Sequence, residues 1–232
     1  MDTRFWGPSG WQLCHLVAHS YSGKHTSAFK SFFENLQDIL PCKFCRESTT
    51  KFVGEKPPDM ENIAKWVYNL HNKVNHKLRS QCKEDPKVIC PPPDPHFEAV
   101  SNIYKALLAQ PPTSPPGLDF LFCVAYNYKS NPNRQAYSAL YKSLKLIYPF
   151  EKLRALITEP NFSDVFGWWY QISRKMCAVT GCEVGTIRGT LQKYGRYKSG
   201  CTRGKTCRNG KKIRDHRHTY KVTHDRLLRI VK

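Results

Sequence analysis

Two cysteines separated by two residues are the part of this sequence best suited to chemistry, in Cys42-Lys43-Phe44-Cys45. Cysteines at this spacing can close a small, reversible disulfide, and a helix N-terminus would stabilise the thiolate of the first one. The chain has ten cysteines in 232 residues, so about 0.4 such pairs are expected by chance. The motif therefore needs support from its surroundings before it predicts a redox-active disulfide.

Two other uses of such a pair depend on what surrounds it. A thioredoxin-like site would need a strand before the motif and a βαβ pattern around it, whereas this motif follows a phenylalanine-rich helical stretch. A zinc site needs a second pair of ligands, and Cys82 and Cys90 are poorly spaced for one. A separate zinc site further along the chain stays open, with Cys177, Cys182, Cys201, Cys207, His216 and His218 as candidate ligands.

Apolar side chains recur at helical spacing on both sides of the cysteine pair, which predicts helices rather than strands. Proline is tolerated in a first turn, so a short helix is predicted to begin at Pro41. About four helices in roughly 80 residues would form a compact helical bundle. Trp11, His15 and Ala18 lie on one face of the first predicted helix. The apolar stripes of the next two are Phe29, Phe32, Phe33, Leu36 and Leu40, and Ile63, Trp66, Val67, Leu70 and Val74.

Three motifs follow one another between Trp6 and Leu78. They are Trp6-Gly7-Pro8-Ser9-Gly10-Trp11 with His15 and Ala18 after it, then Pro41-Cys42-Lys43-Phe44-Cys45, then the segment from Trp66 to Leu78 that contains His71-Asn72-Lys73-Val74-Asn75. Together they resemble the opening, the redox motif and the FAD helix of the Erv/ALR family of FAD-linked sulfhydryl oxidases. The resemblance covers residues 4 to about 90. By analogy, the rest of the chain suggests a member from a large DNA virus.

The resemblance implies an all-α protein that binds FAD inside a four-helix bundle and oxidises the dithiols of protein substrates. Cys42, nearer to solvent, would exchange with substrate, and Cys45 would pass electrons to the isoalloxazine ring. Reduced flavin would then reduce O₂ to peroxide. Lys77 would supply charge toward the phosphates, and His71 and Asn75 would face the adenine and ribose. The residues expected at FAD are Gly7, Trp11, His15, Cys45, His71, Asn72, Val74, Asn75, Lys77 and Leu78.

Several positions depart from the family pattern or extend it. Many members place a cysteine two residues after the tryptophan that corresponds to Trp66, where this chain has Tyr68, so Cys82 and Cys90 are left to pair with each other or elsewhere. The family's Lys-Leu-Gly-Lys becomes Lys77-Leu78-Arg79-Ser80, without the second lysine. Many members also use a mobile second cysteine pair as an electron shuttle, for which Cys201 with Cys207, or Cys177 with Cys182, are the candidates.

The middle of the chain repeats the plan of the first bundle. Leu16 to Tyr21 resembles Cys123 to Tyr128, and Trp66 to Tyr68 matches Trp168 to Tyr170, at offsets of 107 and 102 residues. The competing explanation is that amphipathic helices resemble one another by default. In the second copy Phe150 and Leu153 stand where the cysteine pair would be, and Ser173 stands where His71 would be. This copy is therefore predicted to be structural.

These features divide the chain into three parts: an FAD-binding oxidase domain over 1–95, a degenerate helical repeat over 96–182, and a basic, cysteine-containing tail over 183–232. Family members commonly pair two bundles in a dimer. Two arrangements therefore stay open. Either the second bundle replaces the partner within one chain as an internal pseudo-dimer, or it adds a further surface to a homodimer.

Positive charge is concentrated at the end of the chain. Of a net charge of +19, fifteen Lys and Arg against three acids give +12 from Glu183 onward, and the first 182 residues carry the other +7. Such a segment attracts nucleic acid, anionic lipid or acidic proteins, although a solubilising, partly disordered extension is the plainer explanation. A basic, zinc-knuckled nucleic-acid-binding module without oxidase activity is the main alternative function, and a redox-dead structural relative is a third.

The sequence shows neither an apolar run of the ~18–20 residues that a membrane helix needs nor the pattern of a signal peptide. The longest apolar candidate, Leu118 to Tyr126, is too short. No membrane span is therefore expected, and a viral protein of this kind would act in the host cytoplasm or in the virion.

Overall fold

The computed structural model describes residues 1–84, 88 and 90–198, and the regular elements within these ranges are all helices. The predicted all-α class is thereby confirmed. In chain order the elements are α1 (Thr3–His19), α2 (Thr26–Ile39), α3 (Lys43–Glu55), α4 (Ile63–Glu84), α5 (Phe97–Leu108), α6 (Leu118–Asn127), η1 (Tyr128–Ser130), α7 (Arg134–Ile147), α8 (Glu151–Arg154), α9 (Val165–Thr180) and α10 (Ile187–Gly195). None of the helices in these ranges is both long and apolar enough to cross a bilayer.

Local sequence explains where the first helices begin and which faces they bury. Asp2 caps α1, because its carboxylate accepts a hydrogen bond from the Arg4 backbone N–H at 3.0 Å. The Trp66 indole N–H donates to the Lys56 carbonyl oxygen at 2.9 Å and closes the loop between α3 and α4. The predicted apolar stripes of α2 and α4 are buried, among them Phe29, Phe32, Phe33, Leu36, Ile63, Trp66, Val67 and Leu70.

Helix α5 belongs to the first bundle, because it packs on α1 and α4. Its Val100 and Tyr104 form a small apolar cluster with Leu16 of α1. The predicted boundary near Pro95 therefore falls inside a packed unit, since the proline-rich stretch before α5 is itself bound to α4. The next proline-rich stretch, 111–117, leads into α6, and we propose that the boundary between the two halves lies there.

The second half repeats the order and spacing of the first. Helices α2 and α7 begin and end 108 residues apart, and α3 and α8 begin 108 residues apart. In each half an arginine donates to the carbonyl that ends the preceding long helix, Arg46 to Leu40 at 2.7 Å and Arg154 to Tyr148 at 3.2 Å. The Trp168 indole also donates to the loop that precedes its helix, at Thr158 Oγ1. These correspondences support the proposed internal repeat.

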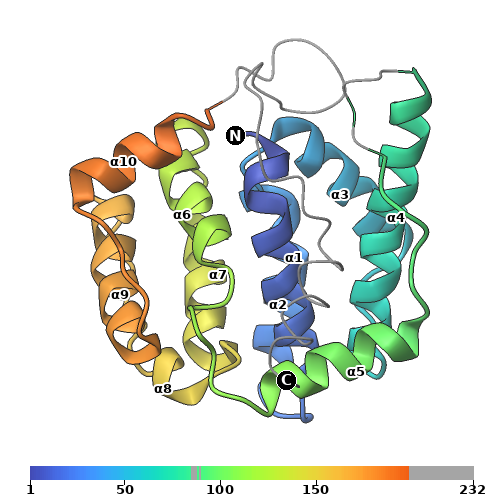
Figure 1. Cartoon of the computed structure of the whole chain (residues 1–232), viewed down its shortest axis with the longest axis horizontal. Coiled ribbons are helices and arrows are strands. Elements are labelled where there is room, and N and C mark those ends of the chain that lie inside the picture. The colour runs from blue at the N-terminus through green and yellow to red at the C-terminus, as the bar shows by residue number, and fades with distance from the viewer. Residues whose placement is uncertain (85–87, 89, 199–232) are drawn as a thin grey trace.

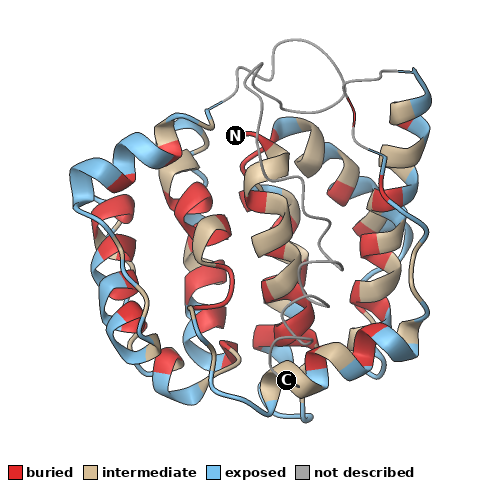
Figure 2. Ribbon diagram, in the orientation of Figure 1, coloured by how far each residue is buried: buried red, intermediate tan, exposed pale blue. Residues whose placement is uncertain are grey.

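The two halves share one hydrophobic core. Figure 1 shows α1–α5 on one side of the molecule and α6–α10 on the other, and Figure 2 shows buried residues on the facing helices α1 and α6. Helix α2 packs on α7, and α1 packs on α6. A Cβ at Gly10 of α1 would come within 3.2 Å of the Phe120 ring of α6, so this glycine permits the close approach of the two helices.

Residues 183–198, predicted to begin the basic tail, are folded against α6 of the second half and the start of α1 in the first half. The hydroxyl of the buried Tyr194 in α10 donates to Asp119 Oδ1 at 2.7 Å. Tyr197 stacks on Phe5 of α1 with ring centroids 3.6 Å apart. Apolar aromatic side chains in this otherwise charged stretch explain the difference. The remainder of the predicted tail, residues 199–232, lies outside the described residues.

Candidate active site

The cysteine pair lies at the N-terminus of α3, which begins two residues after the predicted Pro41. Cys42 is the N-cap residue, and its Sγ accepts a hydrogen bond from the Cys45 backbone N–H at 3.3 Å. Both cysteines are thiols in the structure rather than a disulfide. The sequence therefore places two sulfur atoms at the positive end of a helix, where a thiolate is stabilised.

The exposures of the two thiols are the reverse of the prediction that Cys42 lies nearer to solvent. Cys42 is 0% exposed, whereas Cys45 is half-buried. The N-cap role explains this, because it folds the Cys42 side chain back over the first turn of α3. Residue 1 also packs against this turn, where the Met1 nitrogen donates to the Pro41 carbonyl oxygen at 2.8 Å. The Cys42 thiol is therefore out of contact with solvent in this arrangement.

A lysine of α4 stands beside the cysteine pair. Lys77 donates to Ser48 Oγ of α3 and so bridges the two helices. The hydrogen bond with Cys42, followed by burial, raises the pKa of the Cys45 thiol well above its ordinary value, while the positive charge of Lys77 acts in the opposite direction. Reduced Cys45 is therefore held as a protonated thiol in this arrangement.

Trp11, His15 and His71 meet between α1 and α4, as their motifs predict. The Trp11 indole stacks on the His71 ring, with centroids 4.0 Å apart and planes 7° apart. His15 Nε2 and His71 Nδ1 are hydrogen-bonded at 3.0 Å, and both histidines are buried. Burial, and then the neighbouring His71 and His19, lower the pKa of His15 well below its ordinary value. His15 is therefore neutral at pH 7.

One member of this cluster was not predicted. Tyr104 of α5 is fully buried and stacks on His15 with ring centroids 4.5 Å apart. It also lies against His19, at 5.5 Å between centroids. Val100 and Tyr104 are spaced i, i+4, which indicates a helical face that packs against the rest of the protein. Because α5 lies between two proline-rich stretches, the sequence did not indicate that this face would cover the first bundle.

Asn75 of α4 is buried and is held by a second unpredicted residue. Its Nδ2 donates to Asp94 Oδ1 at 2.8 Å, and the same carboxylate forms an ion pair with Arg79. Where many family members have a cysteine, the Tyr68 hydroxyl donates to the Pro95 carbonyl oxygen at 2.8 Å. These contacts fasten the segment before α5 along the side of α4.

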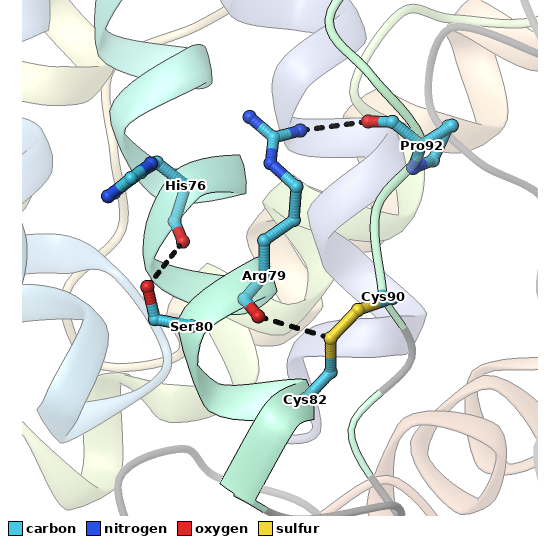
Figure 3. The surroundings of a disulfide bond; sticks show 6 residues. All are labelled: His76, Arg79, Ser80, Cys82, Cys90 and Pro92. Atoms are coloured by element: carbon cyan, nitrogen blue, oxygen red, sulfur yellow. Dashed lines mark hydrogen bonds between the residues drawn. A yellow bond between two sulfur atoms is a disulfide. The ribbon is translucent and has the colours of Figure 1, made fainter.

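A disulfide joins the same segment to the end of α4. Cys82 and Cys90 are bonded, with Cα atoms 5.4 Å apart. Figure 3 shows Arg79, one turn before Cys82, donating to the Pro92 carbonyl oxygen, at 2.8 Å. Of the alternatives that the sequence left open, the structure therefore has the local pairing of Cys82 with Cys90.

The other residues expected at FAD lie on the same two helices. Asn72, Val74 and Leu78 are half-buried on α4, and Gly7 is half-buried on α1. A Cβ at Gly7 would meet no other atom within 4 Å, so packing within the chain does not require a glycine there. The structure therefore brings the residues of all three motifs to α1, α4 and the start of α3.

Cys177 and Cys182 form a second local disulfide. In this form they cannot act as ligands of the alternative zinc site, although they remain a candidate shuttle pair. Cys201, Cys207, His216 and His218 lie outside the described residues. Within the residues that the structure describes, no group of three or more His, Cys, Asp or Glu side chains is placed to hold a metal ion.

The donor set around the cysteine pair is suited to FAD. Indole and imidazole rings can stack on adenine, and the Lys77 ammonium can bind a phosphate. On α4, one turn after Lys77, neither atom of the buried Gln81 amide has a hydrogen-bond partner among the residues that the structure describes. A buried amide without a partner is costly unless a ligand satisfies it. The residues present therefore fit a flavin nucleotide bound along α4.

Fold and site define a helical protein with a Cys-x-x-Cys pair at the N-terminus of α3 and an aromatic and histidine cluster between α1 and α4. The model of the Erv1/Alr family matches residues 8–89. An FAD-linked sulfhydryl oxidase homologue from invertebrate iridescent virus 6 is 32% identical over 92 residues, which cover 34% of this chain and 83% of the relative. The chain belongs to the Erv1/Alr family, which confirms the resemblance read from its three motifs.

Two further relatives carry names of the same kind. A protein of Acanthamoeba polyphaga mimivirus, named as an FAD-linked sulfhydryl oxidase, is 29% identical over 99 residues, covering 38% of this chain and 69% of the relative. The mitochondrial FAD-linked sulfhydryl oxidase of Saccharomyces cerevisiae is 35% identical over 85 residues, 34% of this chain. This chain spans 45% of the yeast relative's length. No solved structure gives a significant match.

Proposed function

We propose that this protein is an FAD-linked thiol oxidase that forms disulfides in protein substrates. The observation that carries the proposal is the Cys42–Cys45 pair at the N-terminus of α3, with Lys77 of α4 beside it. Membership of the Erv1/Alr family and relatives named as FAD-linked sulfhydryl oxidases support the same activity. Pairs of substrate thiols and O₂ are then the two reactants.

In the oxidised enzyme Cys42 and Cys45 form a disulfide. A substrate thiolate attacks Cys42 Sγ, and Cys45 Sγ leaves as a thiolate at the positive end of α3, beside Lys77. The second substrate thiol then attacks the substrate sulfur of the mixed disulfide, which releases Cys42 and closes the substrate disulfide. Two electrons and two protons have moved to the cysteine pair, giving the dithiol form that the structure has.

When bound beside Cys45, FAD would supply the two-electron acceptor for the cysteine pair, with O₂ as the final acceptor and H₂O₂ as the product. Cys45 serves this step because it is half-buried at the start of α3 rather than folded under the turn. Trp11 and His15 would line one wall of the FAD site, His71 and Asn75 would face the adenine and ribose, and Lys77 would bind phosphate. Gly7, Asn72, Val74 and Leu78 would line the remainder of the site.

The proposal is tested on purified full-length protein. It should be yellow, release FAD on denaturation and consume O₂ when given dithiothreitol. Cys45→Ser should keep FAD bound but lose turnover, because the pair can no longer accept electrons. Cys14→Ala, which removes a buried thiol of α1 outside the pair, should keep turnover. A colourless protein, or full turnover by Cys45→Ser, would rule the proposal out.

A further inference from the structure

The side chain of Gln81 in α4 is buried but makes no hydrogen bond within the described part of the chain. The residue is 7% exposed, and within the described part of the chain neither amide atom has a hydrogen-bond partner. A buried donor or acceptor that is left unsatisfied destabilises the folded chain, whereas an apolar side chain of the same shape would not. A glutamine in such a place therefore indicates a ligand that satisfies its amide.

The pairing of α3 with α4 shows where Gln81 lies. Lys73 of α4 donates to Glu55 Oε2 at the end of α3, at 2.8 Å, and Lys77 donates to Ser48 in the middle of α3. The two helices therefore run in opposite directions. Residues 73, 77 and 81 follow one another at successive turns on one face of α4. The next step along this face carries Gln81 toward the first turn of α3, the end that holds Cys45.

Burial along this face increases in the same direction. Lys73 is exposed, Lys77 is half-buried and Gln81 is buried. The outer part of the face is therefore occupied by the Lys73–Glu55 salt bridge and the Lys77–Ser48 hydrogen bond with α3, while its inner part presents a neutral primary amide. A primary amide offers N–H donors and a carbonyl acceptor side by side. Its matching partner is a group with a donor next to an acceptor, such as a cyclic imide.

The isoalloxazine ring of FAD has such a group in its pyrimidine edge, where N3–H lies between two carbonyls. We propose that Gln81 hydrogen-bonds this edge and so positions the flavin ring against Cys45. The proposal rests on the proposed function, because it assumes that FAD binds beside the cysteine pair. Hydrogen bonds to the flavin ring also tune its electronics, so Gln81 would set both affinity and absorption.

The test compares Gln81→Leu with wild type and with Gln135→Leu, the same substitution at an exposed position of α7. Three quantities are measured on full-length protein: FAD affinity, the visible absorption bands of bound flavin, and the thermal stability of the FAD-free chain. Gln81→Leu should weaken FAD binding about tenfold, as expected for one lost buried hydrogen-bonding group, and should shift the bands. Its FAD-free form should be as stable as wild type or more so.

Each other outcome argues against the proposal. Unchanged affinity and spectrum would show that Gln81 does not touch the cofactor, and weaker binding without a band shift would show that it touches another part of FAD. Loss of stability in the FAD-free form would show a structural role instead. Gln135→Leu should match wild type in all three measurements. Failure of the wild-type chain to bind FAD would instead overturn the proposed function itself.

Discussion

At the scale of single residues, the histidines of α1 make the stability of the folded chain depend on pH. Burial is the main reason that the pKa values of both His15 and His19 are lowered, although the backbone carbonyl of His15 partly offsets this for His19. In the unfolded chain both would titrate near pH 6.5. Below that pH the unfolded state therefore binds protons that the folded state does not, and stability falls as pH falls.

We expect the free energy of unfolding of the FAD-free protein to decrease between pH 7 and pH 5, by up to about 1.4 kcal/mol per pH unit for each such proton. His15→Phe keeps a ring to stack on Tyr104 but cannot titrate, so it should flatten this slope. Urea titrations at several pH values measure the effect. His76→Phe, at an exposed position of α4, should keep the wild-type slope, and identical slopes in all three proteins would contradict the prediction.

The sequence predicted residues of the site wherever a motif fixes both type and spacing. Trp11, His15 and His71 come together as expected because the first and third motifs lie on helices α1 and α4, which pack on each other. Tyr104 and Asp94 lie outside those motifs, and only the tertiary path of the chain brings them to the site. The burial of Cys42 could not be predicted from the sequence either, because it depends on the N-cap geometry of this one residue.

At the scale of elements, the stretch from Cys90 to α5 acts as a strap along α4. The disulfide to Cys82, the ion pair of Arg79 with Asp94 and the hydrogen bond from Tyr68 all hold it. The strap in turn places Tyr104 over His15. The proline-rich stretch from Cys90 to Pro95, which the sequence suggests is a linker, therefore helps to position a residue of the site.

We expect removal of the disulfide by the double substitution Cys82→Ser and Cys90→Ser to lower the stability of the FAD-free protein. The bond closes a loop of sequence separation 8, for which chain entropy gives about 2–3 kcal/mol. Denaturant unfolding of the oxidised proteins measures the loss. Reducing agent should destabilise wild type more than the double variant, and an equal effect on both would contradict the assignment.

The elements also show what periodicity can and cannot predict. The stripes of α2 and α4 were recognised because apolar residues recur at every turn over several turns. Helix α8 covers only four residues, too few to give a periodic signal, and only its place 108 residues after the start of α3 reveals it. The proline-rich stretch before α5 marks the end of a helix, but it does not indicate that α5 packs on α1 and α4.

At the scale of the whole molecule, the second half covers faces of the first that would otherwise be exposed. Helix α7 packs on its counterpart α2, and α6 packs on its counterpart α1, so equivalent helices of the two halves face each other. This is the arrangement that a two-fold axis gives in a dimer. We propose that residues 118–180 are a degenerate copy that takes the place of a partner subunit. Phe150 occupies the N-cap position of α8 that corresponds to Cys42 in α3, and Leu153 stands in place of Cys45, so this copy lacks the redox pair.

If the second half takes the place of a partner subunit, the protein should be a monomer in solution. The faces of α1 and α2 that α6 and α7 cover are not available to a second copy, because their apolar side chains are part of one shared core. Light scattering coupled to size-exclusion chromatography at moderate salt should therefore give a mass near 26.9 kDa, with the basic end of the chain screened from non-specific association. A mass of twice that value, unchanged on dilution, would mean that the second half adds a further interface rather than replacing the partner.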